Sequence, residues 1–107
     1  MARADGEAAL RAALGVMRSV AVSRQLRITE KATFEHQALD LDADDVADLL
    51  AGVADEEVHD FKPDDRFPDR TAIVMRIRRD QLTLYVKVSV QVALFDVAVL
   101  SCHRWGM

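Results

Sequence analysis

The sequence predicts an α+β domain in which three N-terminal helices pack on an antiparallel sheet. Helical periodicity and helix caps dominate residues 6–53, whereas a strict two-residue alternation dominates residues 71–102. The chain has 107 residues, of which half are hydrophobic, so we expect one domain over residues 1–107 with its own core.

Each predicted helix has its own local signal. Over residues 6–22, apolar side chains recur at steps of three and four residues, which is the helical period. Thr29 is placed to cap a second helix that runs to about Ala38. Asp42 is a good cap for a third helix, with acidic side chains in its first turn and Gly52 at its end.

The strands are predicted from alternation and from the loops that bound them. The predicted strands are residues 23–28, 55–61, 71–78, 82–90 and 92–102, the first two being short. Residues 62–69 contain Pro63 and Pro68 and are predicted to form a loop. His103 to Met107 are expected to trail off the last strand.

The strand at 82–90 has the clearest two-sided pattern. Leucine and valine occupy every second position and are expected to face the core, while Thr83, Tyr85, Lys87 and Ser89 face outward. Tyr85 and Lys87 then project side by side, an arrangement that suits an anion such as phosphate. His103 and Arg104 follow the next strand and should reach the same end of the sheet.

Charge is unevenly distributed along the chain. Residues 40–69 carry twelve acidic and two basic side chains, whereas residues 70–107 carry six basic and two acidic ones. An acidic segment therefore precedes a basic sheet, although the net charge is −4. No stretch is apolar enough to span a membrane and no signal peptide is recognisable, so we expect a cytoplasmic protein.

The sequence predicts neither a metal site nor a cofactor. Asp40 begins a pattern like that of an EF-hand, but Asp45 replaces the required glycine and Ala51 the required glutamate. The chain has no glycine-rich phosphate loop. The histidines lack metal-type spacing, and His36 and His59 are expected at the surface. The single cysteine, Cys102, is expected to be an inert buried thiol rather than a nucleophile.

Several local patterns resemble the MqsR-type toxins of type II toxin–antitoxin systems. The best are the Tyr-x-Lys of the 84–88 strand and the Ser-x-His at the end of 99–103; the other matching stretches are residues 26–29, 38–42 and 49–53. The similarity covers about residues 10–104. It implies a RelE-like fold and a small endoribonuclease, an mRNA interferase that cleaves mRNA without a metal.

The resemblance also implies a site and partners. His103, Tyr85, Lys87 and Arg76 are the expected catalytic residues. Lys62, Arg78 and Arg104 are the expected RNA-binding residues. Two family positions differ: Asp60 stands where a basic residue is expected, unless Lys62 serves with a local shift, and the Trp-Gln pair of the next strand is absent. The implied partners are mRNA and a cognate antitoxin protein, and a homodimer is left open.

Plainer interpretations stay open for the same residues. Arg76, Arg78 and Arg79 are also typical of the charges that protect sheet edges from aggregation. Trp105 either packs under a helix or meets a partner, and His103 is also compatible with a flexible tail. The alternative function is a catalytically inactive RelE-like protein-interaction module, in which the acidic residues 40–69 dock a partner.

Overall fold

The chain folds into three helices and a five-stranded mixed sheet, and four of the five strands follow the last helix in sequence. A computed structural model describes residues 2–106, with side chains from residue 6 onward. The elements are α1 (Ala2–Val22), β1 (Arg27–Ile28), α2 (Glu30–Ala38), α3 (Ala43–Ala51), β2 (Val58–Pro63), β3 (Thr71–Arg79), β4 (Leu82–Gln91) and β5 (Asp96–Arg104). Two short 3-10 turns, Asp55–Glu57 and Val92–Leu94, precede β2 and β5. The predicted α+β class and the order of helices and main strands are therefore confirmed.

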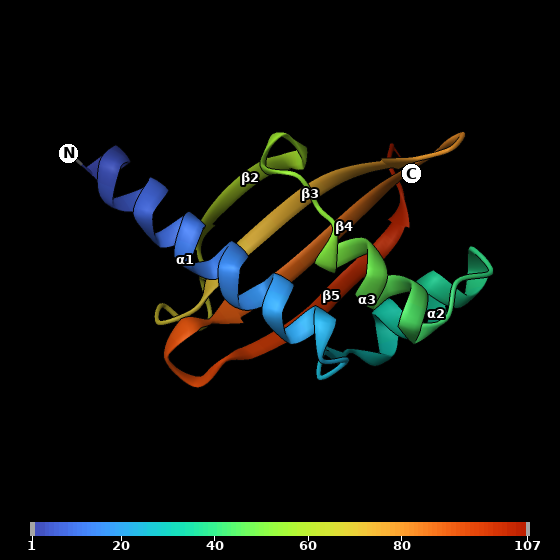
Figure 1. Ribbon diagram of the computed structural model, residues 1–107, viewed down its shortest axis with the longest axis horizontal. Helices are drawn as coiled ribbons and strands as arrows, with labels where there is room; N and C mark the ends of the chain where they lie inside the picture. The colour runs from blue at the N-terminus through green and yellow to red at the C-terminus, as the bar shows by residue number, and fades with distance from the viewer. Residues whose placement is uncertain (1, 107) are drawn as a thin grey trace.

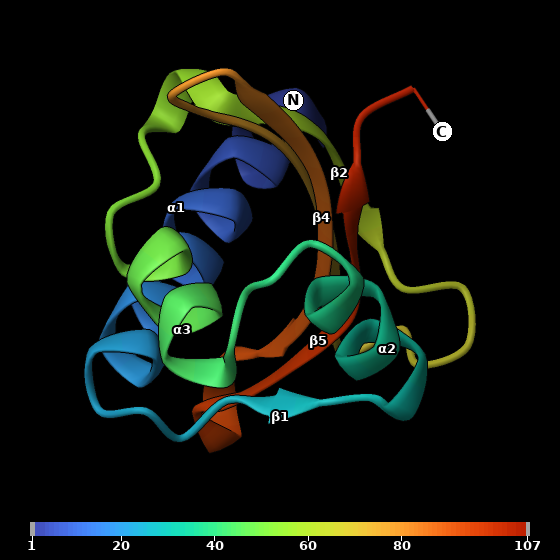
Figure 2. The same ribbon diagram turned by 90° about the vertical axis from the view of Figure 1, so that its right-hand side faces the viewer.

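The strand order in the sheet is β1-β5-β4-β3-β2. Figure 1 shows β5, β4, β3 and β2 side by side, and Figure 2 labels β1. β2 to β5 form an antiparallel meander, as expected. β1 pairs in parallel with β5, Arg27 opposite Ala98 and Ile28 opposite Val99, so the prediction of a wholly antiparallel sheet is wrong at this edge. The physical reason is that β1 meets a strand about 70 residues later in the chain, and no local turn dictates its direction.

Helices α1 and α3 pack together on one face of the sheet (Figure 2). The apolar stripe of α1 and the inward side chains of β3, β4 and β5 form one core. Its largest fully buried members include Met17, Leu50, Ile73, Met75, Ile77 and Leu84. Burial of such a side chain stabilises the fold by about 1.5–3 kcal/mol. Although α1 has 21 residues, no helix within residues 2–106 is long and apolar enough to cross a membrane.

Both predicted helix caps are present. The Thr29 hydroxyl accepts a hydrogen bond from the Ala32 N–H at 3.2 Å, so α2 begins where its sequence indicates. Asp42 accepts from the Asp45 N–H at 2.8 Å, and the Asp45 carboxylate accepts from the Asp42 N–H at 2.9 Å. This reciprocal capping box fixes the start of α3, and Gly52 follows its last turn as expected.

Helix α2 lies along the edge of the sheet, beside β5, rather than on the face that α1 and α3 cover (Figure 2). Its Glu35 carboxylate accepts from the Cys102 N–H of β5 at 3.0 Å, and Lys31 donates to the Ser101 hydroxyl at 2.9 Å. The prediction that all helices share one face is thus wrong for α2. Because β1 pairs with only two residues of β5, α2 covers the remaining edge and satisfies one of its exposed N–H groups.

The last strand begins at Asp96, not at Val92 as predicted. Val92–Leu94 forms a 3-10 turn, and Phe95 adopts a left-handed backbone with φ of 48°, which ends β4 and starts the return. The apolar run Val-Ala-Leu-Phe hides this turn in the sequence. As a consequence β5 extends to Arg104, so His103 and Arg104 belong to the strand rather than to a trailing tail.

Other boundaries also differ from the prediction. The predicted strand 23–28 is reduced to Arg27–Ile28, because the chain turns after α1 with Arg24 at a positive φ of 63°. The predicted strand 55–61 begins at Val58, because Asp55–Glu57 forms a 3-10 turn. α1 begins at Ala2 rather than at residue 6. Lys62 and Pro63 belong to β2, so the connecting loop covers residues 64–70.

The exposure of His59 and the burial of Cys102 are as predicted, but the exposure predicted for His36 is wrong. His59 is exposed, and Cys102 is fully buried, with burial and then the nearby Glu35 raising the pKa of its thiol to about 11. His36, expected at the surface, is only 3% exposed. Its Nδ1 lies 2.7 Å from the Leu41 carbonyl oxygen, which accepts a hydrogen bond across the α2–α3 connection. A polar partner beyond the end of the helix makes this burial tolerable.

Candidate functional site

The sheet face that points away from α1 and α3, here called the open face, carries the predicted site. In the strand register Arg76 of β3 stands opposite Tyr85 of β4, and Tyr85 stands opposite His103 of β5. Lys87 lies two residues along β4, opposite Ser101. Because side chains alternate between faces, all four predicted catalytic residues project from the same face. The structure therefore brings Arg76, Tyr85, Lys87 and His103 together.

An aromatic cluster occupies the end of the open face near the C-terminus. The rings of Tyr85 and His103 are stacked, with centroids 4.8 Å apart and an angle of 8° between their planes. Trp105 follows β5, and its backbone N–H donates to the Thr83 carbonyl at 2.9 Å, which holds the ring over the sheet. The Trp105 ring lies 5.9 Å from that of Tyr85 and meets the ring of His59 edge-on at 4.8 Å. Trp105 thus packs against the sheet and not under a helix.

Two basic side chains flank the aromatic cluster. The Arg76 guanidinium lies 5.2 Å from the centre of the Trp105 ring, within the range of a cation–π contact. Within residues 2–106, neither Arg76 nor Lys87 forms an ion pair with a carboxylate. Two positive charges beside stacked rings therefore remain available to an anionic ligand.

Hydrogen bonding fixes the proton on one nitrogen of His103. Nδ1 lies 2.8 Å from the Arg104 carbonyl oxygen, which can only accept, so Nδ1 carries the hydrogen. In the neutral ring the lone pair is then on Nε2. Burial alone raises the pKa of Glu35, but hydrogen bonds from Lys31 and the Cys102 N–H, together with attraction to His103, bring that pKa below its ordinary value.

The three predicted RNA-binding residues lie in different places. Lys62 is on β2 and projects from the open face, where it pairs with Asp65 at 3.2 Å. Arg78 lies on β3 two residues after Arg76, on the same face, and is exposed. Arg104 stands opposite Leu84, whose side chain is in the core, so its side chain leaves β5 on the side away from His103. The structure does not bring Arg104 into the site.

Sequence reasoning missed two members of the cluster. A register shift between Val58 and Asp60 places His59 at an irregularity in β2, and period-two alternation does not anticipate such a shift. The sequence predicts that Trp105 packs under a helix or meets a partner, because nothing in it shows that the chain turns back over the sheet after Arg104. The only sign of these two members in the sequence is the presence of a histidine near the start of β2 and of a tryptophan just after β5.

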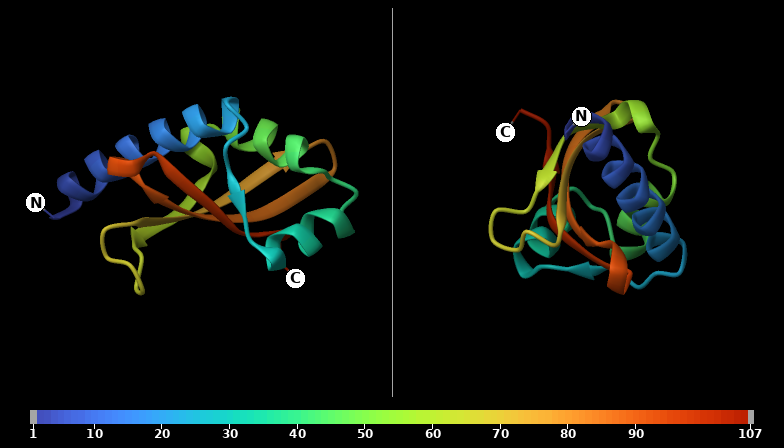
Figure 3. Two further views of the ribbon diagram at one scale, coloured as in Figure 1. Left: turned by 90° about the horizontal axis from the view of Figure 1, so that it is seen from below. Right: turned by 90° about the vertical axis from the view of Figure 1, so that its left-hand side faces the viewer.

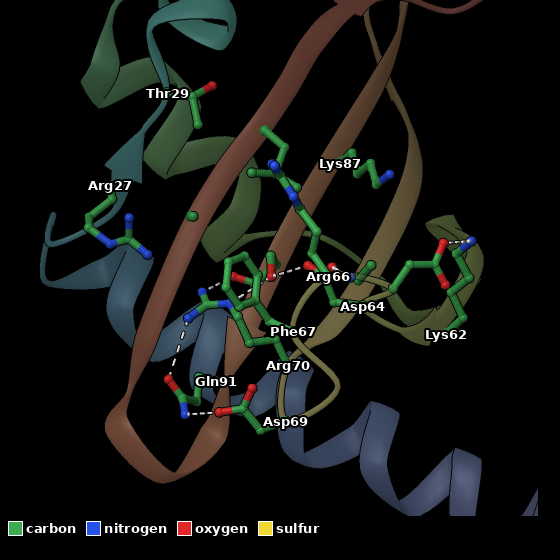
Figure 4. A pocket seen from close by; sticks show the side chains of 15 residues that line it. Arg27, Thr29, Lys62, Asp64, Arg66, Phe67, Asp69, Arg70, Lys87 and Gln91 are labelled. Carbon is green, nitrogen blue, oxygen red and sulfur yellow. Dashed lines mark hydrogen bonds and ion pairs between the residues drawn. The ribbon is translucent and has the colours of Figure 1, made fainter.

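A pocket with a volume of about 590 Å³ lies between the loop 64–70 and the open face, farther along the sheet than the aromatic cluster (Figure 4). We call it the loop pocket. Figure 4 shows loop side chains lying over β4 and β5, with Lys62 and Lys87 on one side and Arg27 and Thr29 on the other. The loop is on the side of the sheet opposite α1 (Figure 3).

Arg70 fastens the loop to the sheet. Its guanidinium donates to the Ser89 hydroxyl at 2.8 Å and the Ser89 carbonyl at 2.9 Å, and it pairs with Asp96 at 2.7 Å. The Ser89 hydroxyl in turn donates to Asp64 at 3.0 Å. Hydrogen bonds from Arg27 and then from Arg70 hold the pKa of Asp96 far below its ordinary value. The loop is therefore tied at both of its ends.

Comparison with known proteins adds no identification. No protein-family model matches the chain, and no curated protein matches it. Within residues 2–106, no group of three or more His, Cys, Asp or Glu side chains is arranged to hold a metal ion.

Proposed function

We propose that the chain is a metal-independent endoribonuclease that cleaves mRNA, an MqsR-like toxin of a toxin–antitoxin system with a RelE-like fold. The observation that carries the proposal is the stacked pair of Tyr85 and His103 beside the unpaired charges of Arg76 and Lys87, on the sheet face opposite α1 and α3. The resemblance described above rests on the same Tyr-x-Lys and Ser-x-His strands.

RNA cleavage without a metal needs three contributions. A base removes the proton of the 2′-hydroxyl, an acid protonates the departing 5′-oxygen, and cations stabilise the charge on the phosphorus. In this proposal Nε2 of His103 is the proton-transfer atom, because Nδ1 is bonded to a carbonyl. Tyr85 is the second proton carrier or a stacking surface, and Arg76 and Lys87 stabilise the phosphate.

The proposal extends to the rest of the open face. Stacking of unpaired bases on aromatic side chains is the usual basis of single-strand RNA recognition, and Trp105 offers such a surface beside Tyr85. Lys62 and Arg78 contribute further positive charge on the same face. The proposed partners are cytoplasmic mRNA and an antitoxin protein that blocks the open face.

The interaction-module alternative has less support. It needs the acidic residues 40–69 to be free for a partner, but ten of the twelve acids there already bond to other groups of the chain. These are Asp42, Asp44, Asp45, Asp48, Asp55, Glu57, Asp60, Asp64, Asp65 and Asp69. Seven of these acids serve in helix caps or internal ion pairs, so the acidic segment is less available to a partner than its composition suggests.

Induced expression tests the proposal. Wild type should arrest bacterial growth and fragment mRNA, whereas His103→Ala should relieve both effects. Tyr85→Phe should also relieve them where the Tyr85 hydroxyl carries a proton, and should leave them in place where the ring only stacks. Arg11→Ala is the matched control, since Arg11 is exposed on α1, far from the open face. Normal growth with intact RNA on wild-type expression, at a protein level equal to that of the variants, would exclude the toxin function.

A further inference from the structure

The loop pocket lies beside the proposed cleavage site on the open face. Lys87 belongs to both, because it lies two residues from Tyr85 on β4 and its side chain lines the pocket. A ligand that contacts the stacked Tyr85 and His103 rings can therefore continue past Lys87 into the pocket without leaving the sheet. Strand β4 therefore connects the proposed cleavage site with the loop pocket.

The lining of the pocket combines one exposed aromatic ring with unpaired positive charge. Phe67 is 55% exposed although it lines a pocket, so most of its ring has no protein partner. Arg66 and Lys87 form no ion pair within residues 2–106. The floor contains Ala72 and Ala98, whose small side chains leave space below the ring. A flat apolar surface next to cations is the combination that binds single-stranded nucleic acid.

The acidic residues of the pocket do not oppose this use. Asp64, Asp65 and Asp69 line it, but Asp64 accepts from Ser89, Asp65 pairs with Lys62, and Asp69 accepts from Gln91. Lys62 compensates the charge of Asp65, whereas the neutral partners of Asp64 and Asp69 fix only the positions of these carboxylates. The lining as a whole has five basic and three acidic side chains, so positive charge prevails. The pocket also needs little rearrangement to accept a ligand, since the ties of Arg70 to Ser89 and Asp96 hold the loop in place.

We infer that the loop pocket is a subsite for one nucleotide of the single-stranded RNA, next to the nucleotides at the cleavage site. The base stacks on Phe67, and Arg66 and Lys87 contact the phosphate that links it to the cleavage site. This inference rests on the proposed function for the identity of its ligand. A volume of about 590 Å³ is within the range of pockets that hold small organic ligands, and a single nucleotide is of that size class.

The test is the affinity for a fluorescently labelled RNA hexanucleotide with 2′-O-methyl groups, in which the attacking hydroxyl is blocked. Binding is followed by fluorescence anisotropy at about 0.05 M salt, where phosphate contacts are strong. Phe67→Ala should weaken binding about 10-fold or more, as expected for loss of one stacked base. Phe34→Ala is the control, because Phe34 is also largely exposed, at 67%, but lies on α2, outside the pocket.

A set of hexanucleotides, each lacking one base, then assigns the contact. At one position, removal of the base should weaken binding to wild type about 10-fold, yet should not weaken binding to Phe67→Ala any further. Arg66→Ala should lower the slope of log affinity against log salt by about one. The inference is overturned if Phe67→Ala binds like Phe34→Ala, or if its loss is the same whichever base is missing.

Failure of the subsite and failure of the proposed function have different signatures. If wild type cleaves unmodified RNA but Phe67→Ala shows no coupling to any base, the subsite alone is wrong. If the coupling is present but wild type cleaves no RNA, the ribonuclease is wrong and the subsite is supported as an RNA-binding pocket. Absence of RNA binding by wild type overturns the subsite, whatever else the pocket accepts.

Discussion

Asp96 at the start of β5 is the residue whose charge most directly holds the loop pocket together. Its carboxylate accepts from Arg27 at 2.8 and 2.6 Å and pairs with Arg70 at 2.7 Å. Arg70 is the more buried of the two guanidiniums, and it also carries the loop's bonds to Ser89. Asp96→Asn keeps the shape of the side chain but removes the charge that both arginines use.

The expected cost of Asp96→Asn is about 1–2 kcal/mol of unfolding free energy at pH 7. Hydrogen bonds to charged groups contribute about 1.5–3 kcal/mol. The expected cost is near the low end of this range because the Asp96 side chain is 28% exposed, so water screens part of its attraction to the two arginines. Asn retains one acceptor oxygen, and Arg70 keeps its bonds to Ser89, so the loop should loosen rather than unfold.

The cost should depend on pH with a definite sign. The pKa of Asp96 is well below its ordinary 3.8 in the folded chain, so the unfolded chain takes up the proton first as pH falls. The stabilisation is therefore complete well above pH 3.8 and declines as pH falls below it toward the folded pKa. Urea unfolding of wild type and Asp96→Asn should show a difference of about 1–2 kcal/mol at pH 7 and a smaller one at pH 3.

Asp80→Asn is the control for this measurement, because Asp80 is exposed in the β3–β4 turn and asparagine also tolerates its positive φ of 55°. It should leave the unfolding free energy unchanged at both pH values. An Asp96→Asn effect that is equal at pH 7 and pH 3, or absent at pH 7, would refute the assigned role of the Arg27–Asp96–Arg70 network.

Three further predictions concern the core. Met75→Ala should lower the unfolding free energy by about 2–5 kcal/mol in urea titrations, because Met75 is fully buried and its removal leaves a cavity; a cost below 1 kcal/mol would contradict that packing. His36→Leu should cost about 1–3 kcal/mol, because the Leu41 carbonyl loses its donor, and a neutral result would contradict the hydrogen bond. Cys102 should resist iodoacetamide in the native protein at pH 8 and react after unfolding, since burial raises the pKa of its thiol to about 11; rapid native labelling would refute its burial.

Local patterns were sufficient to predict the helices, the central strands and four of the six side chains that meet on the open face. The cap of Asp42, the alternation over residues 82–90 and the Tyr85–Lys87 pair each depend on a few neighbouring residues, and each is present in the structure. Local chemistry determines such features, so one sequence is enough to find them.

Features that depend on distant contacts were not predictable. The parallel pairing of β1, the position of α2 at the sheet edge and the burial of His36 all depend on partners that no local pattern names. The same holds for the loop pocket, because Arg70 reaches Ser89 on another strand. Trp105 joins the aromatic cluster through a turn after β5 that the sequence does not mark.

The most direct test of the ribonuclease is in vitro cleavage of a single-stranded RNA in the presence of EDTA, with purified wild type beside His103→Ala. We predict fragments with 2′,3′-cyclic phosphate and 5′-hydroxyl ends from wild type, unaffected by EDTA, and a rate at least about 100-fold lower for His103→Ala. Intact RNA with wild type, or equal cleavage by both proteins, would contradict the assignment of the chemistry to the stacked Tyr85 and His103 on the open face.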